Sequence, residues 1–296
     1  MYHNFANSRD ADGDAVLVDD ARAQLAYLRR HFEVVPLPVL VETSISDSRL
    51  KDRVVALTVD DGRHNFYECF YPLLKEFALP ATFFVVSSFI GGEDWIWTDK
   101  ILWLAEQPCR PDALDTDMID HFFAELNEMR PAVRDCKIAD LATLMQVEIP
   151  PLPPQKYAPC SWSELREMAD SGLVEIGSHT VSHPILSSLG EPEALWQLTE
   201  SRSQIERNVG RKVDSFCFPN GKLGDYRTIH FRQLQDAGYK RAVAARFGLV
   251  NRSSNAFDLP RIGISGRSDL ISFCKDVDGA GYYQWKLEAA LGARGA

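Results

Sequence analysis

Short, unbroken apolar runs alternate along this 296-residue chain with longer segments of helical spacing, and this alternation limits the fold more than any other feature. Residues 54–59 and 81–86 have strand length and do not alternate polar with apolar side chains, which is typical of strands covered on both faces. Strands that alternate with helices predict an α/β fold with a parallel sheet. Four further strands are expected over residues 173–177, 216–218, 242–244 and 261–264.

The segments between these runs carry the apolar spacing of helices. Residues 21–31 and 66–77 each place apolar side chains on one face. A long amphipathic helix is expected over residues 193–208. Ser161 and Glu164 have the spacing of a capping box, in which each side chain binds a backbone N–H of the other residue. That pair predicts the start of another helix.

Residues from about 93 to 160 interrupt this rhythm, because they are rich first in Trp and Leu and then in Pro. They predict a mostly helical insertion with an extended, Pro-rich return, inside a single domain over residues 1–296. A lid over a functional site and simple packing are both compatible with it. Trp95 and Trp97 are interpreted as core residues rather than as sugar-stacking ones, and Asp99 is a candidate substrate contact.

Charge and composition exclude several classes of partner. The net charge is -10 and the isoelectric point is near 5.2, which argues against nucleic acid and against adhesion to anionic lipid. The first residues show no basic start followed by an apolar run, and no stretch of about 18 apolar residues occurs. We therefore expect a cytoplasmic protein without a transmembrane segment. Its oligomeric state is left open.

The six cysteines form no C-x-x-C pair, so a structural zinc knuckle is not expected. With a cytoplasmic location, the cysteines are interpreted as reduced thiols that are mostly buried.

Two adjacent carboxylates follow the first long apolar run, in the sequence Thr58-Val59-Asp60-Asp61-Gly62. In βα folds, catalytic groups collect at the C-terminal ends of strands. Adjacent carboxylates repel each other unless a cation or a proton relieves the repulsion. One of the pair can bind a metal while the other accepts a proton, although Asp-Asp-Gly alone is also a common turn sequence.

Two histidines four residues apart, His179 and His183, follow another apolar run. If they lie on one side of a helical turn, both can reach one ion. With Asp61 they make a three-ligand site that leaves room for water, which is the open arrangement of catalytic zinc. Such a metal makes its water more acidic and polarises a carbonyl, and Asp60 would then be the base. Zn²⁺ suits these ligands best, but Co²⁺, Ni²⁺, Fe²⁺ and Mn²⁺ remain possible.

The ordered set of motifs resembles the NodB-type polysaccharide deacetylase family. The matching segments cover most of the chain: residues 2–3, 32–37, 55–84, 179–183, 216–221, 237–239 and 259–262. The resemblance implies a distorted, incomplete (β/α) barrel that hydrolyses N-acetyl groups on sugars. It also implies that Asp60 is the base and that Asp61, His179 and His183 are the metal ligands. Pro219 and Asn220 would form a wall of the site, with a backbone N–H near Asn220 helping to hold the oxyanion.

This chain departs from the family pattern in three places. Val59 replaces a usual Phe, which is a packing change. The third motif lacks the Arg that normally steadies the base; we hypothesise that Arg261 takes over, with a structural ion pair as the alternative. The late Leu-x-His that supplies the acid is missing. His3 and His64 are the candidate acids or substrate-binding residues, unless Asp60 itself returns its proton to the amine.

The sequence as a whole predicts a metal-dependent hydrolase that removes an N-acetyl or N-formyl group from an amino sugar. With a cytoplasmic location, its substrate would be a nucleotide sugar, a lipid-linked saccharide or a small glycoside. Two alternatives remain open. The first is a hydrolase of a non-sugar amide or ester, and the second is a carbohydrate-binding protein that kept the fold and lost catalysis.

Overall fold

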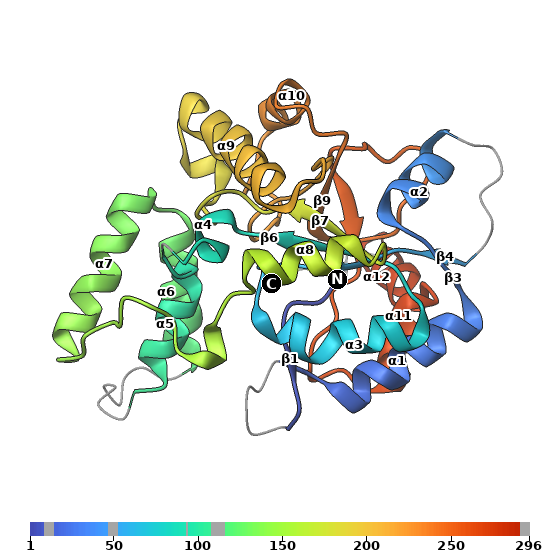
Figure 1. Ribbon diagram of the computed structural model, residues 1–296, viewed down its shortest axis with the longest axis horizontal. Coiled ribbons are helices and arrows are strands. Elements are labelled where there is room, and N and C mark those ends of the chain that lie inside the picture. The colour runs from blue at the N-terminus through green and yellow to red at the C-terminus, as the bar shows by residue number, and fades with distance from the viewer. Residues whose placement is uncertain (9–14, 47–52, 93, 108–115, 291–296) are drawn as a thin grey trace.

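A sheet of six parallel strands forms the centre of the computed structural model, and the strands lie side by side in their sequence order (Figure 1). Parallel neighbours of this kind need a crossover segment between them, and helices supply most of these crossovers. The α/β prediction is confirmed. The strands are β5 (Leu57–Val59), β6 (Ala81–Val85), β7 (Val174–Ser178), β8 (Ser215–Cys217), β9 (Arg241–Phe247) and β10 (Leu259–Arg261). The structure describes residues 1–8, 15–46, 53–92, 94–107 and 116–290.

The barrel is incomplete, as expected, because β5 and β10 are the two edges of the sheet and do not pair with each other. The first residues of the chain lie across this gap. The Tyr2 N–H donates to the Thr58 carbonyl over 2.9 Å, and the Met1 carbonyl accepts from the Ile264 N–H over 2.9 Å. Main-chain contacts of residues 1–2 therefore connect the two edges where a strand pair is missing.

The strand predicted over residues 54–59 is in fact two strands, so this part of the prediction was wrong. β4 (Val54–Val55) pairs with β3 (Glu33–Val34) in a separate ladder, whereas β5 joins the main sheet. The two halves have different partners, and Ala56 lies between them outside either strand. Another two-stranded ladder joins β1 (Phe5–Ala6) to β2 (Val16–Leu17).

Helices surround the sheet, and the predicted ones are present with adjusted ends. The capping box of Ser161 and Glu164 is formed. The predicted helix over residues 66–77 begins as a π-helix, because Pro72 in the next turn has no N–H to donate. The helices outside the insertion are α1 (Val18–His31), α2 (Leu37–Val41), η1 (Glu42–Ser46), η2 (Phe66–Phe70), α3 (Tyr71–Phe77), α4 (Ser87–Ile90), α8 (Trp162–Asp170), η4 (Leu186–Ser188), α9 (Glu191–Val209), α10 (Thr228–Asp236), α11 (Leu270–Val277) and α12 (Ala280–Ala290).

Three α-helices occur in the described part of the stretch predicted as an insertion, and they lie together at one side of the sheet (Figure 1). They are α5 (Trp97–Ala105), α6 (Thr116–Asn127) and α7 (Pro131–Leu144), and the short helix η3 (Gln155–Tyr157) lies in the Pro-rich return. The insertion has its own apolar cluster, distinct from the main core. Trp95 and Trp97 are buried, which confirms that they are core residues.

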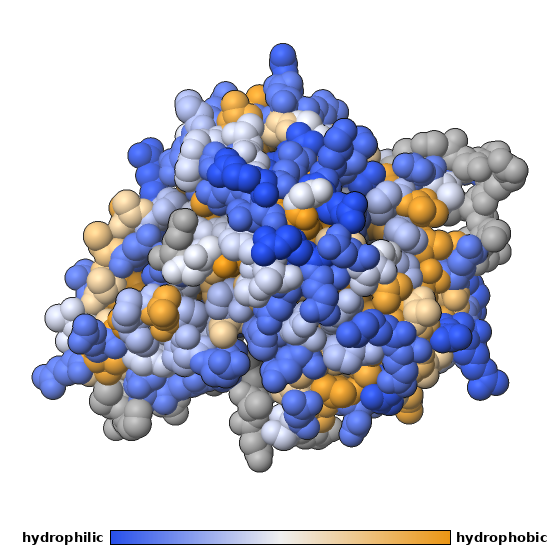
Figure 2. Space-filling model, in the orientation of Figure 1, coloured by the Kyte–Doolittle hydropathy of each residue, from blue (hydrophilic) through white to orange (hydrophobic). Residues whose placement is uncertain are grey.

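The main core lies between the sheet and its helices, and aromatic side chains such as Phe66, Phe83 and Phe216 are fully buried there. The face of the molecule seen in Figure 2 is mostly hydrophilic, with scattered hydrophobic residues. Among the described residues, none of the helices combines the length and the apolar character needed to cross a bilayer.

Candidate active site

The end of β5 and the end of β7 carry the four residues at the centre of the candidate site. Asp60 and Asp61 follow β5 directly, and His179 and His183 follow β7. Only β6 lies between these two strands in the sheet. Because parallel strands end at the same edge of a sheet, both loops reach the same place, and all four side chains are buried there.

The three candidate metal ligands converge on one point. The Nε2 atoms of His179 and His183 lie 3.6 and 3.8 Å from Asp61 Oδ1, which is too far for hydrogen bonds. Two ligand atoms on one tetrahedral zinc lie about 3.4 Å apart, since each is about 2.1 Å from the ion. The spacing and the donor types therefore fit a divalent metal such as Zn²⁺.

The protonation states of these ligands also fit a metal. The His179 Nδ1–H donates to the Cys217 carbonyl over 2.8 Å, which leaves the Nε2 lone pair facing Asp61. Burial, followed by the neighbouring His179, lowers the pKa of His183 to about 3, and burial also lowers the pKa of His179. Burial alone would raise the pKa of Asp61, but the charge of Arg63, together with smaller contributions from the nearby histidines, outweighs it and the pKa is lowered. Neutral imidazoles and a carboxylate are the forms that bind metal.

The two histidines do not lie on a helical turn, so that expectation was wrong. They lie in a loop in which Thr180 and His183 have φ values of 71° and 56°. Pro184 disfavours the right-handed helical conformation at the residue before it, which prevents a helix through His183. The His183 N–H donates to Thr180 Oγ1 over 3.0 Å and holds the turn. Such left-handed residues concentrate at functional sites.

Asp60 is paired with Arg261, the residue suggested to replace the missing arginine. Nη1 and Nη2 of Arg261 donate to Oδ1 and Oδ2 of Asp60 over 2.8 and 2.7 Å, and both residues are buried. Burial alone would raise the pKa of Asp60, but the charge and hydrogen bonds of Arg261 outweigh it and hold the pKa well below its usual range. Asp60 is therefore a carboxylate at neutral pH.

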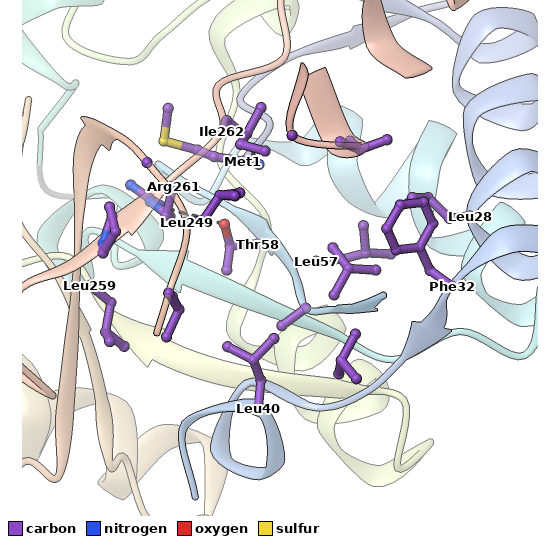
Figure 3. Close-up of a pocket in the computed structure, with 18 of the residues that line it drawn as sticks. Met1, Leu28, Phe32, Leu40, Leu57, Thr58, Leu249, Leu259, Arg261 and Ile262 are labelled. Atoms are coloured by element: carbon purple, nitrogen blue, oxygen red, sulfur yellow. Dashed lines mark hydrogen bonds between the residues drawn. The ribbon is translucent and has the colours of Figure 1, made fainter. Parts of the chain in front are cut away.

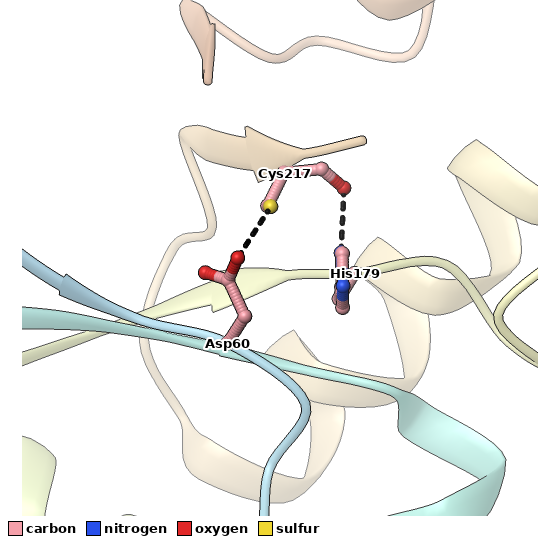
Figure 4. Close-up of side chains that lie close together, drawn as sticks. All are labelled: Asp60, His179 and Cys217. Atoms are coloured by element: carbon pink, nitrogen blue, oxygen red, sulfur yellow. Dashed lines mark hydrogen bonds between the residues drawn. The ribbon is translucent and has the colours of Figure 1, made fainter. Parts of the chain in front are cut away.

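Sequence reasoning missed Cys217, which contacts both members of this pair. Its Sγ lies 3.4 Å from Asp60 Oδ2 and 3.2 Å from Arg261 Nη2, and Figure 4 shows it facing Asp60 from β8. Burial raises the pKa of Cys217 well above its usual value, so it remains a thiol. The sequence signal that could have pointed to Cys217 is its position in the third family motif, the motif that lacks the usual arginine.

The two candidate acids lie in different surroundings. His3 Nε2 is 3.7 Å from Asp60 Oδ2, and the His3 side chain is 45% exposed. His64 instead contacts helix α8, where its Nε2 lies 3.1 Å from Glu164 Oε1, and its Nδ1 lies 3.8 Å from Glu68. The structure thus brings His3 close to Asp60, the candidate base, while the side-chain contacts of His64 are with glutamates outside the candidate ligand cluster.

The loop after β8, which holds Pro219 and Asn220, is fixed by its own contacts. Asn220 has a φ of 57°, and its side-chain amide donates to Asp225 over 2.7 Å. A Cβ on Gly221 would lie 2.7 Å from the Ala245 nitrogen, so only glycine fits there. The Asn220 side chain is thus committed to its loop, whereas its backbone N–H binds no acceptor in the described part of the chain.

Asp99, a candidate substrate contact, has no exposed surface and binds Arg63 Nη2 over 2.5 Å. It therefore cannot touch a substrate, and the suggestion was wrong.

A mostly apolar cavity of about 520 Å³ lies near the open edges of the barrel, lined in part by Leu57, Thr58 and Arg261 (Figure 3). The three candidate metal ligands do not line this cavity.

Comparisons with known proteins point to one family. The family model of polysaccharide deacetylases matches residues 47–242. The poly-β-1,6-N-acetyl-D-glucosamine N-deacetylase of Escherichia coli K12 is 26% identical over 284 residues, which cover 86% of this chain and 34% of that protein. The chain thus spans about a third of the length of that relative.

Solved structures share the fold. The deacetylase PplD of Streptococcus pyogenes has a TM-score of 0.65 at 17% identity, covering 94% of this chain and 96% of that one. IcaB from Ammonifex degensii has a TM-score of 0.62 at 20% identity, covering 93% of each chain. At these identities the likeness supports the fold alone.

Proposed function

Because the chain belongs to the polysaccharide deacetylase family, we propose that it hydrolyses the N-acetyl group of an amino sugar and uses a divalent metal to do so. One observation carries this proposal: the Nε2 atoms of His179 and His183 face Asp61 Oδ1 beside the ionised carboxylate of Asp60. That arrangement combines a metal site with a proton acceptor, which amide hydrolysis requires.

The residues of the site divide the work of hydrolysis. When bound, the metal supplies Lewis acidity, which polarises the acyl carbonyl and makes a nearby water more acidic. Asp60 accepts the proton of the attacking water, while Arg261 holds the carboxylate in place and keeps it ionised. The Asn220 backbone N–H is a donor for the oxygen that gains negative charge. His3, or the protonated Asp60, gives a proton to the leaving amine.

We favour an N-acetylglucosamine polymer as the substrate, because the relative from E. coli is named for deacetylating poly-β-1,6-N-acetyl-D-glucosamine. Nucleotide-linked and lipid-linked amino sugars, and N-formyl groups, are further candidates for the same site. The metal is proposed to be Zn²⁺, in line with the Asp/His/His ligand set. The cytoplasmic location and the single domain over residues 1–296 stay predictions.

Acetate release from a panel of substrates tests the function. The panel holds β-1,6- and β-1,4-linked N-acetylglucosamine oligomers, a nucleotide-linked and a lipid-linked N-acetylglucosamine, their N-formyl analogues and simple non-sugar amides and esters. Each is measured with zinc-loaded and with chelated protein. Zinc-dependent release from a sugar supports the proposal. Release only from non-sugar compounds, or oligomer binding without release, would replace it with one of the two alternatives.

Loss of His3 is expected to alter the alkaline side of the pH–rate profile. A general acid must be protonated, so activity falls as pH rises through its pKa. In His3→Ala that alkaline limb should disappear and kcat should drop by about 10²-fold. His64→Ala is the matched control and should keep the limb. If both variants keep it, Asp60 itself returns the proton.

Loss of Arg261 is expected to move the acidic limb of the profile to higher pH. In Arg261→Gln the burial that raises the pKa of Asp60 loses its main opposing contribution, so the base becomes protonated, and inactive, at a higher pH. The pH dependence of kcat/KM measures this shift. Arg241→Gln is the control, because Arg241 is also a buried arginine of the sheet but pairs with Glu175. An unchanged profile in Arg261→Gln would leave Arg261 as a structural residue.

A further inference from the structure

The first turn of α5, in the insertion, contacts both loops that carry the candidate metal ligands. Trp97 Nε1 donates to the carbonyl of His183 over 3.0 Å. Asp99, two residues later, accepts from Arg63 over 2.5 Å, and Arg63 Nε in turn lies 3.4 Å from Asp61 Oδ2. The first turn of α5 therefore contacts the loop after β5, which carries Asp61, and the loop after β7, which carries His183.

The contact with Arg63 fixes the orientation of the Asp61 carboxylate. Arg63 binds Oδ2 of Asp61, so Oδ1 is left to face the two histidines. A buried arginine beside a ligand would also compete with a metal ion for the negative charge of that ligand. Asp99 offsets this competition, because it is fully buried and takes the shorter contact with the guanidinium. The pair thus orients Asp61 without neutralising it.

The contact with His183 holds a strained part of the backbone. His183 has a φ of 56°, a conformation that non-glycine residues adopt only when their surroundings impose it. Trp97 binds its carbonyl, and Arg134 from α7 lies over the Trp97 ring, with 4.6 Å from Cζ to the ring centroid. Two helices of the insertion therefore keep the Trp97 indole in the position that binds this carbonyl.

We propose that Trp97 and Asp99 are positioning residues for the metal, so that the affinity of the site for its ion depends on the insertion as well as on the barrel loops. This inference rests on the proposed metal site. It also bears on the idea that the insertion is a lid. The Arg63–Asp99 pair joins barrel to insertion in a buried position, so a swinging insertion would separate two buried charges. The first turn of α5 therefore stays docked against the two loops that carry the proposed ligands.

Zinc binding by the metal-free full chain tests the proposal directly. Zn²⁺ is titrated against a chromophoric chelator with wild type, Trp97→Phe and Asp99→Asn, and urea unfolding of each metal-free protein is measured beside it. Trp97→Phe keeps an aromatic ring and removes the N–H donor. Trp103→Phe is the matched control, because Trp103 lies on the same helix and packs against the insertion cluster.

Removal of a residue that supports a metal ligand typically weakens metal affinity by about 10- to 100-fold. We therefore expect Trp97→Phe and Asp99→Asn each to raise the zinc Kd by about tenfold or more. Trp103→Phe should leave the zinc Kd unchanged. A purely structural role would lower the resistance to urea but leave the Kd of the folded protein at its wild-type value. That result in both variants would overturn the inference and leave the proposed hydrolase standing. A wild-type chain that binds no zinc would overturn both.

Discussion

Asp60→Asn is expected to lower acetate release by about 10²- to 10⁴-fold, the range typical of general acid–base groups. Asparagine has nearly the shape of aspartate but cannot accept the proton of water. The three metal ligands are untouched, so zinc affinity should stay within a few-fold of wild type. Single-turnover acetate release, measured at saturating zinc beside a zinc titration, separates the two effects.

The stability of this variant needs its own measurement. Asp60 forms a buried pair with Arg261, and breaking such a pair can cost about 3–5 kcal/mol because one charge is left without a partner. Asp258→Asn is the control: it also removes an arginine partner, that of Arg246, but lies outside the site. A folded Asp60→Asn protein with wild-type rates would exclude Asp60 as the base.

Removal of the metal is expected to abolish hydrolysis altogether. Chelated protein should show no acetate release above the uncatalysed rate, and about one equivalent of Zn²⁺ per chain should restore it. His179→Gln should not be restored, because the amide replaces a strong zinc ligand with a weak one. Acetate release and zinc content, measured on the same samples, give the correlation.

His121→Gln provides the matched control for the histidine change, because His121 lies exposed on α6 in the insertion. It should keep full activity and full zinc content. Activity that persists in chelated wild type, with zinc verified as absent, would mean that the Asp/His/His cluster is not the centre of catalysis.

The metal cluster could be predicted from the sequence because each of its members follows an apolar run. Strand ends of a parallel sheet share one edge, so Asp61 and the two histidines can come near each other even though Asp61 and His179 are 118 positions apart in the sequence. The partial barrel was predictable only through the resemblance to the polysaccharide deacetylase family, and the strand order of the structure agrees with it. The backbone at His183 was not, because apolar spacing carries no information about a left-handed turn.

The supporting contacts were beyond sequence reasoning for a different reason. Trp97 and Asp99 look like ordinary helix residues, and only the docking of α5 against two loops gives them their partners. Cys217 was covered only by the general interpretation of the cysteines as mostly buried thiols. Its contacts with Asp60 and Arg261 depend on three strands, β5, β8 and β10, that are not neighbours in the sheet. Long-range packing leaves no local pattern.

The bridge between the edges of the barrel bears on the order in which the molecule can assemble. The Tyr2–Thr58 and Met1–Ile264 contacts, like the Asp60–Arg261 pair, join parts of the chain that are far apart in sequence. Closing such long loops costs conformational entropy before the contacts between the joined segments can stabilise the fold. Residues 61–183 already contain all three proposed metal ligands, whereas Asp60, the proposed base, gains its arginine only when β10 is in place. A ribosome-bound chain that ends before residue 261 therefore has all three proposed metal ligands but lacks the arginine that pairs with Asp60 in the folded protein.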